Sequence, residues 1–206
     1  CGILFKTPEF FFRSIANEHK FNLSKNFAIG MFFLNNNIEK RKSSIKIVEK
    51  IIRENNFVLA GWREVPTDQK ICGEDALKTL PYITQAFINP SDKTGAKDIE
   101  SKLLVIRRKI EIAIAKTNDD IFYITSLSSK VILYKGMVMP KHLAKFYLDL
   151  SNEKLETSLC VFHQRFSTNT TPQWSLAQPF RMLAHNGEIN TVRANRNWSQ
   201  ARSSIF

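Results

Sequence analysis

The densest concentration of polar and special residues lies between His163 and Trp198. It contains two stretches, HQRFSTNT from His163 to Thr170 and HNGEINT from His185 to Thr191. Each stretch follows a short apolar run of the kind that is typical of a β-strand. Polar groups at strand ends stand where a rigid scaffold presents a functional site. These two stretches are therefore the first candidates for a site.

Two sets of groups in these stretches have a plausible chemistry. Arg165 can clamp a substrate carboxylate through two parallel N–H donors, which a lysine cannot do, although a structural arginine paired with an acid is the commoner case. Asn186 and Gly187 offer a side-chain amide and a backbone N–H side by side, which can stabilise the oxyanion that forms when an amide is attacked. Asn-Gly is also a frequent hairpin turn. A helix predicted just after it would add a dipole favourable to negative charge.

The histidines and cysteines give no metal or disulfide pattern. His163 and His185 have no metal-ligand spacing around them, so we expect them to orient or pack against other groups. Cys1, Cys72 and Cys160 are an odd number without paired spacing, which argues against a disulfide framework and a zinc site and favours a reducing compartment. The two internal cysteines lie in apolar surroundings and are predicted to be small core residues.

Composition indicates one globular domain or most of one, because the chain has 206 residues, 43% hydrophobic and 11% aromatic. It contains no apolar run of about 18 residues, and its start lacks the features of a signal peptide, so we expect no membrane association. The net charge of +11 leaves open a basic, non-catalytic domain that binds nucleic acid or an acidic partner. On a helix predicted over 38–55, however, apolar residues recur at helical spacing and leave the lysines as a solvated stripe without interleaved aromatic residues.

Apolar periodicity and turn residues predict alternating helices and strands with no internal repeat. The predicted helices cover 9–16, 38–55, 68–80, 103–116, 141–150 and 190–203. The predicted strands cover 27–34, 57–63, 83–88, 121–126, 131–135, 159–162 and 182–184. The strands over 121–126 and 131–135 have the spacing of a hairpin. This mixture favours a layered α+β architecture over an all-parallel wound sheet.

Longer stretches closely resemble the large chain of the glutamate synthases. The resemblance rests on VFHQRFSTNTTP (161–172), LAQPFR (176–181), HNGEINT (185–191) and NRNW (195–198), and upstream on GWREVP (61–66), RRKIE (107–111), FYITSLSS (122–129) and YKGM (134–137). It covers nearly the whole chain and implies a class II glutamine amidotransferase domain. The fold so implied is a four-layer αββα sandwich of the N-terminal nucleophile hydrolase type, here an incomplete domain over residues 1–206.

The resemblance also implies roles for individual residues. Arg165 would hold the α-carboxylate of glutamine, and Thr168 would lie alongside it. Asn186 and Gly187 would form the oxyanion hole. The reaction would be attack of a thiolate on the side-chain amide, release of ammonia and hydrolysis of the thioester to glutamate.

Cys1 is a doubtful nucleophile. The family uses an amino-terminal cysteine followed by glycine, and Cys1-Gly2 fits that description. The residues that follow, however, resemble an internal strand of the family that leads into a Pro-x-x-Phe-Phe helix, here from Pro8. We therefore expect the family's nucleophile to lie upstream and its amino-group-binding aspartate to come after Phe206. On this view the chain alone hydrolyses glutamine weakly or not at all.

For the full protein, the resemblance implies a synthase domain of the same polypeptide that makes glutamate from 2-oxoglutarate with FMN and a 3Fe-4S cluster. No residues for these cofactors are expected within this chain. The variants at Phe162-His163 and at 170–172 favour ferredoxin as the electron donor. The bias toward Lys, Asn, Ile and Phe suggests an AT-rich genome such as that of a plastid, so we expect a plastid stroma or a bacterial cytoplasm as the location. Class II amidotransferases with other acceptors, which make glucosamine phosphate, phosphoribosylamine or asparagine, are the nearer alternative. The Gly-Glu-Ile-Asn-Thr continuation over 187–191 speaks against them.

Overall fold

The computed structural model describes residues 1–91, 98–166, 171–180 and 192–203. The strands are β1 (Gly2–Lys6), β2 (Ala28–Leu34), β3 (Phe57–Glu64), β4 (Tyr82–Pro90), β5 (Tyr123–Ser128), β6 (Val131–Lys135) and β7 (Cys160–His163). The α-helices are α1 (Glu9–Glu18), α2 (Ile38–Glu54), α3 (Glu74–Lys78), α4 (Ile99–Ala115), α5 (Leu143–Phe146) and α6 (Val192–Arg202). Short 3-10 turns cover Gln69–Ile71, Pro140–His142, Leu148–Ser151 and Trp174–Leu176.

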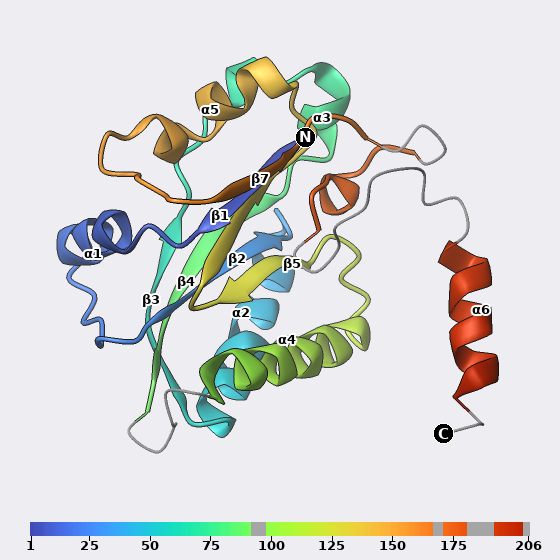
Figure 1. The fold of residues 1–206 in the computed structure, drawn as a ribbon, viewed down its shortest axis with the longest axis horizontal. Coiled ribbons are helices and arrows are strands. Elements are labelled where there is room, and N and C mark those ends of the chain that lie inside the picture. The colour runs from blue at the N-terminus through green and yellow to red at the C-terminus, as the bar shows by residue number, and fades with distance from the viewer. Residues whose placement is uncertain (92–97, 167–170, 181–191, 204–206) are drawn as a thin grey trace.

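The strands form two antiparallel sheets (Figure 1). One sheet has four strands in the order β3-β4-β2-β5, and the other has three strands in the order β6-β1-β7. Helices α2 and α4 lie together over the four-stranded sheet in Figure 1. Two antiparallel sheets with helices on them confirm the predicted α+β sandwich.

Strand β2 separates two hydrophobic cores. Because successive side chains of a strand point to opposite faces, Ile29, Met31 and Phe33 join a core that also contains side chains of the three-stranded sheet. Phe32 and Leu34 join a second core with α2 and α4. All seven residues of β2 are buried, so a strand with cores on both faces has a continuous apolar sequence.

Helix α2 follows the prediction closely. The Asn37 side chain accepts hydrogen bonds from the backbone N–H groups of the first turn and so caps the helix. Val48 and Ile52 are buried in the second core, whereas Lys46 and Lys50 are exposed. The expected solvated lysine stripe is therefore confirmed.

The predicted hairpin of 121–126 and 131–135 is wrong, because β5 pairs with β2 and β6 pairs with β1. The chain passes from one sheet to the other at Ser128 and Ser129, which are held by Glu100 of α4. The Ser128 hydroxyl donates to Glu100 Oε2 at 2.8 Å, and the Ser129 hydroxyl donates to Oε1 at 2.8 Å. The Ser128 oxygen in turn accepts from the backbone N–H of Lys130 at 3.0 Å. These bonds to a helix distant in sequence direct the strand that follows into the second sheet.

Two predicted helices are broken into shorter pieces. The predicted helix over 68–80 contains a 3-10 turn and the five-residue α3, because Cys72 and Gly73 between them are extended, with ψ of 144° and 161°. The predicted helix over 141–150 consists of the four-residue α5 between two 3-10 turns. Among the residues described, no helix combines the length and apolar character needed to cross a membrane.

A buried polar network joins the two sheets. Arg63 of β3 forms a two-pronged ion pair with Asp149, with N–O distances of 2.7 and 2.8 Å. The Asp149 carboxylate also accepts from the Tyr134 hydroxyl of β6 at 2.8 Å, and Gln85 of β4 contacts both Arg63 and Tyr134 at 2.8 Å. Arg63 and Asp149 are 8% and 4% exposed, so the pair is removed from water. The network therefore fixes β6 relative to the four-stranded sheet.

Candidate active site

The three-stranded sheet brings the ends of its strands to one edge. Gly2 of β1 pairs with Lys135 of β6 on one side and with His163 of β7 on the other. Arg165 follows β7 by two residues and is exposed, so it emerges at the same edge as Cys1. Its backbone N–H donates to His163 Nδ1 at 3.2 Å. The orienting or packing role of His163 stays a prediction.

Cys1 is packed into this edge and is 2% exposed. Its thiol donates a hydrogen bond to the Val138 carbonyl at 2.9 Å, and its amino group donates to the Gly136 carbonyl at 2.9 Å. Burial, and then the charge of Lys135, lower the pKa of the amino group from 8.0 to about 6. The thiol of Cys1 is closed off from solvent.

Lys135 is an unexpected feature of the same edge. It is fully buried, and its ammonium donates to the Ser175 carbonyl at 2.7 Å and to the Tyr123 hydroxyl at 3.2 Å. The ammonium also lies 4.5 Å and 4.7 Å from the ring centroids of Tyr123 and Phe180. Burial, and then the charge of Arg107, lower the pKa of Lys135 from 10.5 to about 7.

The segment 173–180 packs against this lysine. Trp174 is buried, and its indole N–H donates to the Ala76 carbonyl at 3.1 Å. A Cβ on Gly136 would lie 2.3 Å from the Trp174 ring, so only glycine allows this close contact. A Cβ on Gly2 would likewise lie 2.7 Å from the Gln178 carbonyl oxygen. The segment is thus fitted to the ends of both β1 and β6.

Of the residues predicted for the site, the structure places Cys1 and Arg165 at one edge of the sheet. Thr168, Asn186 and Gly187 lie outside the described residues, as do His185 and the predicted strand 182–184. The convergence of the guanidinium and the amide donors on one substrate therefore stays a prediction. Among the described residues, no group of three or more His, Cys, Asp and Glu could hold a metal ion.

The prediction that both internal cysteines are core residues is half wrong. Cys72 is partly buried and packs against the core between the sheets. Cys160 is exposed, as are Val161 and Phe162 after it, which are 49% and 63% exposed. Strand β7 pairs with β1 at the end of its sheet, so the described residues leave its side chains largely uncovered. An apolar run in the sequence therefore did not mean burial here.

Sequence reasoning missed Lys135. Strands often end in a lysine whose ammonium reaches solvent. The lysine at the end of the apolar run VILYK fits this common pattern, so the local sequence did not indicate a buried residue. The available signal was its place in the YKGM segment, between a buried tyrosine and a glycine that admits an indole ring.

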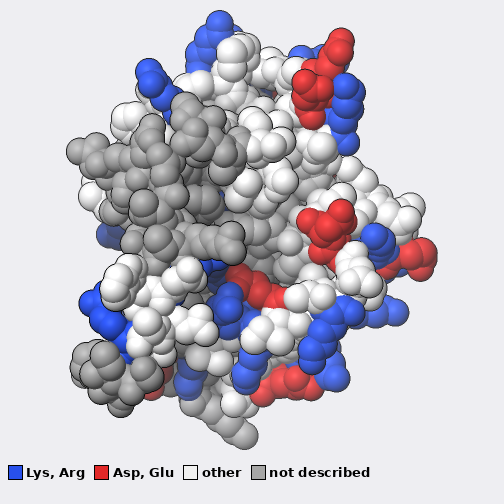
Figure 2. Space-filling model, turned by 90° about the vertical axis from the view of Figure 1, so that its right-hand side faces the viewer, with Lys and Arg blue, Asp and Glu red and all other residues white. Residues whose placement is uncertain are grey.

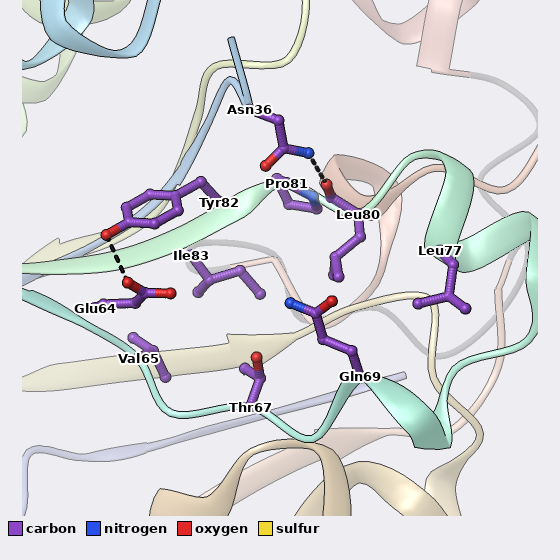
Figure 3. A pocket seen from close by; sticks show the side chains of 10 residues that line it. All are labelled: Asn36, Glu64, Val65, Thr67, Gln69, Leu77, Leu80, Pro81, Tyr82 and Ile83. Carbon is purple, nitrogen blue, oxygen red and sulfur yellow. Dashed lines mark hydrogen bonds between the residues drawn. The ribbon is translucent and has the colours of Figure 1, made fainter. Parts of the chain in front are cut away.

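A small cavity of about 160 Å³ lies between the end of β3 and the start of β4 (Figure 3). Some of its polar lining residues form hydrogen bonds with neighbouring protein groups. The Tyr82 hydroxyl donates to Glu64 at 2.9 Å, and the Asn36 amide donates to the Leu80 carbonyl at 2.6 Å. None of the predicted site residues lines it. The cavity is therefore not the predicted site.

On the face drawn in Figure 2, the charged side chains of the described residues do not gather into one basic field. Figure 2 shows a face on which Lys and Arg side chains are interspersed with Asp and Glu. Several basic residues pair with acidic neighbours on their own helix, as Lys50 does with Glu54 at 3.8 Å and Arg107 with Glu111 at 2.7 Å. This distribution favours a solvated surface over a groove that follows a phosphate backbone.

Replacement of Lys135 by methionine is expected to remove a pH dependence of stability. The lysine has a pKa of about 7 in the folded protein and 10.5 ordinarily, which we take for the unfolded chain. Between these values the unfolded chain binds more protons, so the free energy of unfolding of the wild-type protein rises with pH. From pH 7 to pH 9 it should rise by about 2 kcal/mol relative to Lys135→Met, at ~1.4 kcal/mol per pKa unit.

Urea unfolding of both proteins at pH 7 and pH 9 measures this difference. Lys46→Met, which changes an exposed lysine of α2, is the matched control. If the free energies of unfolding of the wild-type protein and of Lys135→Met differ by the same amount at both pH values, the lysine titrates normally.

Comparison with known proteins agrees with this geometry. The family model for "Glutamine amidotransferases class-II" matches residues 1–206. The chain therefore belongs to the class II glutamine amidotransferases, whose N-terminal nucleophile hydrolase fold agrees with the two facing antiparallel sheets.

Within that family, the chain is similar to glutamate synthases. The large chain of the NADPH-dependent glutamate synthase of Azospirillum brasilense is 40% identical over 206 residues, which cover 99% of this chain and 14% of the relative. Ferredoxin-dependent glutamate synthase of Cyanidium caldarium is 42% identical over 210 residues, covering 99% and 13%. The chloroplastic/mitochondrial ferredoxin-dependent glutamate synthase 1 of Arabidopsis thaliana is 41% identical over 177 residues, covering 85% and 11%. The chain thus spans between 11% and 14% of the length of these curated relatives.

Proposed function

We propose that this chain is the ammonia-releasing part of a glutamate synthase. Glutamine is hydrolysed to glutamate and ammonia, and the ammonia passes to a synthase domain of the same polypeptide, which forms a second glutamate from 2-oxoglutarate. The observation that carries this proposal is the match of glutamate synthases to 99% of the chain at 40–42% identity. The glutamate synthase names of these relatives, together with the 187–191 sequence, disfavour a class II enzyme with another acceptor.

The proposed roles at the site follow from the chemistry of amide hydrolysis. Arg165 binds the α-carboxylate of glutamine through parallel N–H donors, and Thr168 lies beside it. A thiolate attacks the side-chain amide carbon, and the oxygen of the tetrahedral intermediate accepts hydrogen bonds from Asn186 and from the Gly187 backbone N–H. The proton that the thiol gave up passes to the amide nitrogen, the C–N bond breaks and ammonia leaves. Water then hydrolyses the thioester to glutamate and free thiol. The exposure of Arg165 at the edge of the sheet supports its access to substrate.

The electron supply belongs to the whole protein. We infer that FMN and a 3Fe-4S cluster carry electrons in the synthase domain, and that reduced ferredoxin provides them. The residue variants at Phe162-His163 and 170–172 support ferredoxin. Relatives named for ferredoxin and for NADPH match this chain at nearly equal identity. A plastid stroma or a bacterial cytoplasm suits both groups of relatives.

The proposal is tested with the protein, glutamine, 2-oxoglutarate and either reduced ferredoxin or NADPH. Glutamine should be consumed, and glutamate should form at the expense of 2-oxoglutarate with ferredoxin as donor. Turnover with NADPH alone would overturn the choice of donor and leave the activity standing. Intact glutamine, together with retention on a polyanion that weakens steeply in salt, would instead support the nucleic-acid-binding alternative.

Cys1→Ala is expected to leave ammonia release by residues 1–206 alone unchanged, at a level that is weak or zero. We propose that Cys1 is a packed residue just before β1 and not the nucleophile, because its thiol is shielded from solvent and bonded to the Val138 carbonyl. A coupled ammonia assay on the wild-type chain and on Cys1→Ala measures the effect. Brisk ammonia release that the substitution abolishes would instead make Cys1 the nucleophile.

A further inference from the structure

Lys135 is a buried cation with an unusual set of partners. No ion pair joins it to a carboxylate within the part of the chain that the structure describes. Its ammonium contacts one backbone carbonyl, that of Ser175, one phenol, that of Tyr123, and two aromatic rings. Removing an ammonium from water is costly, so a lysine kept in such a place needs a reason other than the stability of the sheet.

The hydrogen bond to the Ser175 carbonyl connects Lys135 to the segment 173–180. Ser175 lies in the 3-10 turn of the segment 173–180, and Phe180 at the other end of this segment packs against the same ammonium. One cation thus contacts the segment at two points five residues apart. Tyr123 anchors the ammonium to β5, so the segment is fixed to both sheets.

The segment 173–180 lies in the sequence between the two parts of the proposed glutamine site. Ser175 follows Arg165 by ten residues and precedes Asn186 by eleven. The segment is therefore the connection between the residues proposed to bind the glutamine carboxylate and those proposed to bind the oxyanion. Register places Lys135 in one row with Gly2 and His163, so the same lysine also lies at the strand ends from which the Arg165 stretch departs.

We propose that Lys135 is a positioning residue for the glutamine site. By fixing the segment 173–180 at the strand ends from which the Arg165 stretch departs, it keeps the chain around Arg165 in place, although it touches no substrate itself. This inference rests on the proposed function, since it assigns a role within that reaction. Small displacements of groups that hold a substrate have large effects on rate, because the reacting atoms must be aligned.

Lys135→Met in the full protein tests the proposal, because methionine keeps much of the volume of the side chain and removes the N–H donors. We expect the KM for glutamine to rise about tenfold and kcat to fall by a similar factor. Backbone amides of the segment 173–180 should exchange with deuterium faster than in the wild-type protein. Glutamate formation from 2-oxoglutarate with ammonium supplied in place of glutamine should be unchanged.

Controls separate the outcomes. Lys46→Met should match the wild-type protein in all three measurements. Tyr123→Phe, which removes one acceptor of the ammonium and leaves the Ser175 carbonyl, should give the same changes as Lys135→Met in weaker form.

Unchanged hydrogen exchange in 173–180 would overturn the proposal, because the lysine would then not hold the segment. Faster exchange with an unchanged KM for glutamine would also overturn it and would leave the proposed function intact. Loss of the ammonium-supported reaction as well would assign Lys135 to the stability of the fold alone. A wild-type protein that does not consume glutamine would instead refute the proposed function.

Discussion

Arg165→Lys is expected to lower kcat/KM for glutamine by about 100- to 1000-fold, which corresponds to ~3–4 kcal/mol. A guanidinium presents two parallel N–H groups to a carboxylate, whereas an ammonium offers a point charge without the matching geometry. The substitution keeps the positive charge, so the loss reports the two-pronged contact. Steady-state kinetics of ammonia release across glutamine concentrations measures it.

The matched control is Arg53→Lys, which changes an exposed arginine on α2 that is distant from the strand ends of the site. It should leave kcat/KM within a factor of about two, as surface substitutions usually do. Glutamate formation with ammonium in place of glutamine should survive Arg165→Lys. If Arg165→Lys changes kcat/KM for glutamine by less than about fivefold, this arginine does not contact the substrate.

Asp149→Asn is expected to lower the free energy of unfolding by about 3–5 kcal/mol. The substitution preserves the shape of the side chain but leaves the Arg63 guanidinium buried without its counter-charge. It also weakens the bond from the Tyr134 hydroxyl, whose pKa is raised by burial and then by the Asp149 charge. Urea unfolding with a constant slope is the appropriate measurement.

An exposed ion pair provides the comparison. Glu9→Gln removes a carboxylate that pairs with Arg13 at 2.7 Å on α1, where Glu9 is 63% exposed, and should cost about 1 kcal/mol or less. The double substitution Arg63→Met and Asp149→Leu should recover part of the stability lost in Asp149→Asn, because it removes both buried charges. Similar costs for Asp149→Asn and Glu9→Gln would show that the network does not fasten the sheets together.

Most strands and the long helices were predictable because residues close together in the sequence determine them. Strand β2 has a continuous apolar sequence because it lies between two cores, and α2 has an asparagine cap and an apolar stripe. The family resemblance then added the sandwich architecture, which local periodicity does not specify. Strand β7 was also found, but its exposure was not, because burial depends on neighbouring elements.

The partner of each strand was harder to predict because it depends on distant contacts. The interpretation of 121–135 as a hairpin failed because Glu100, more than twenty residues upstream, binds the serines at the crossing point. The helix over 68–80 was predicted to be continuous, yet Gly73 stands at an extended break before α3. In both places tertiary hydrogen bonds or backbone geometry overrode local propensity.

The site was predictable where a residue type implied a chemistry. Arg165 was identified from its place after an apolar strand, and the structure puts it at that strand's end. Lys135 was not identified, because its burial is produced by Ser175 and Phe180, about forty residues away in the chain. A lysine next to solvent and a lysine covered by a distant segment have the same local sequence.

The central claim is that one glutamine is held between the guanidinium of Arg165 and the amide donors of Asn186 and Gly187. A crystal structure of the protein with an unreactive glutamine analogue tests it most directly. We predict two hydrogen bonds from Arg165 to the α-carboxylate, with the donors of Asn186 and Gly187 at about 2.7–3.1 Å from the position of the developing oxyanion. Arg165 and Asn186 on opposite faces of the protein, with no shared cleft, would contradict the account.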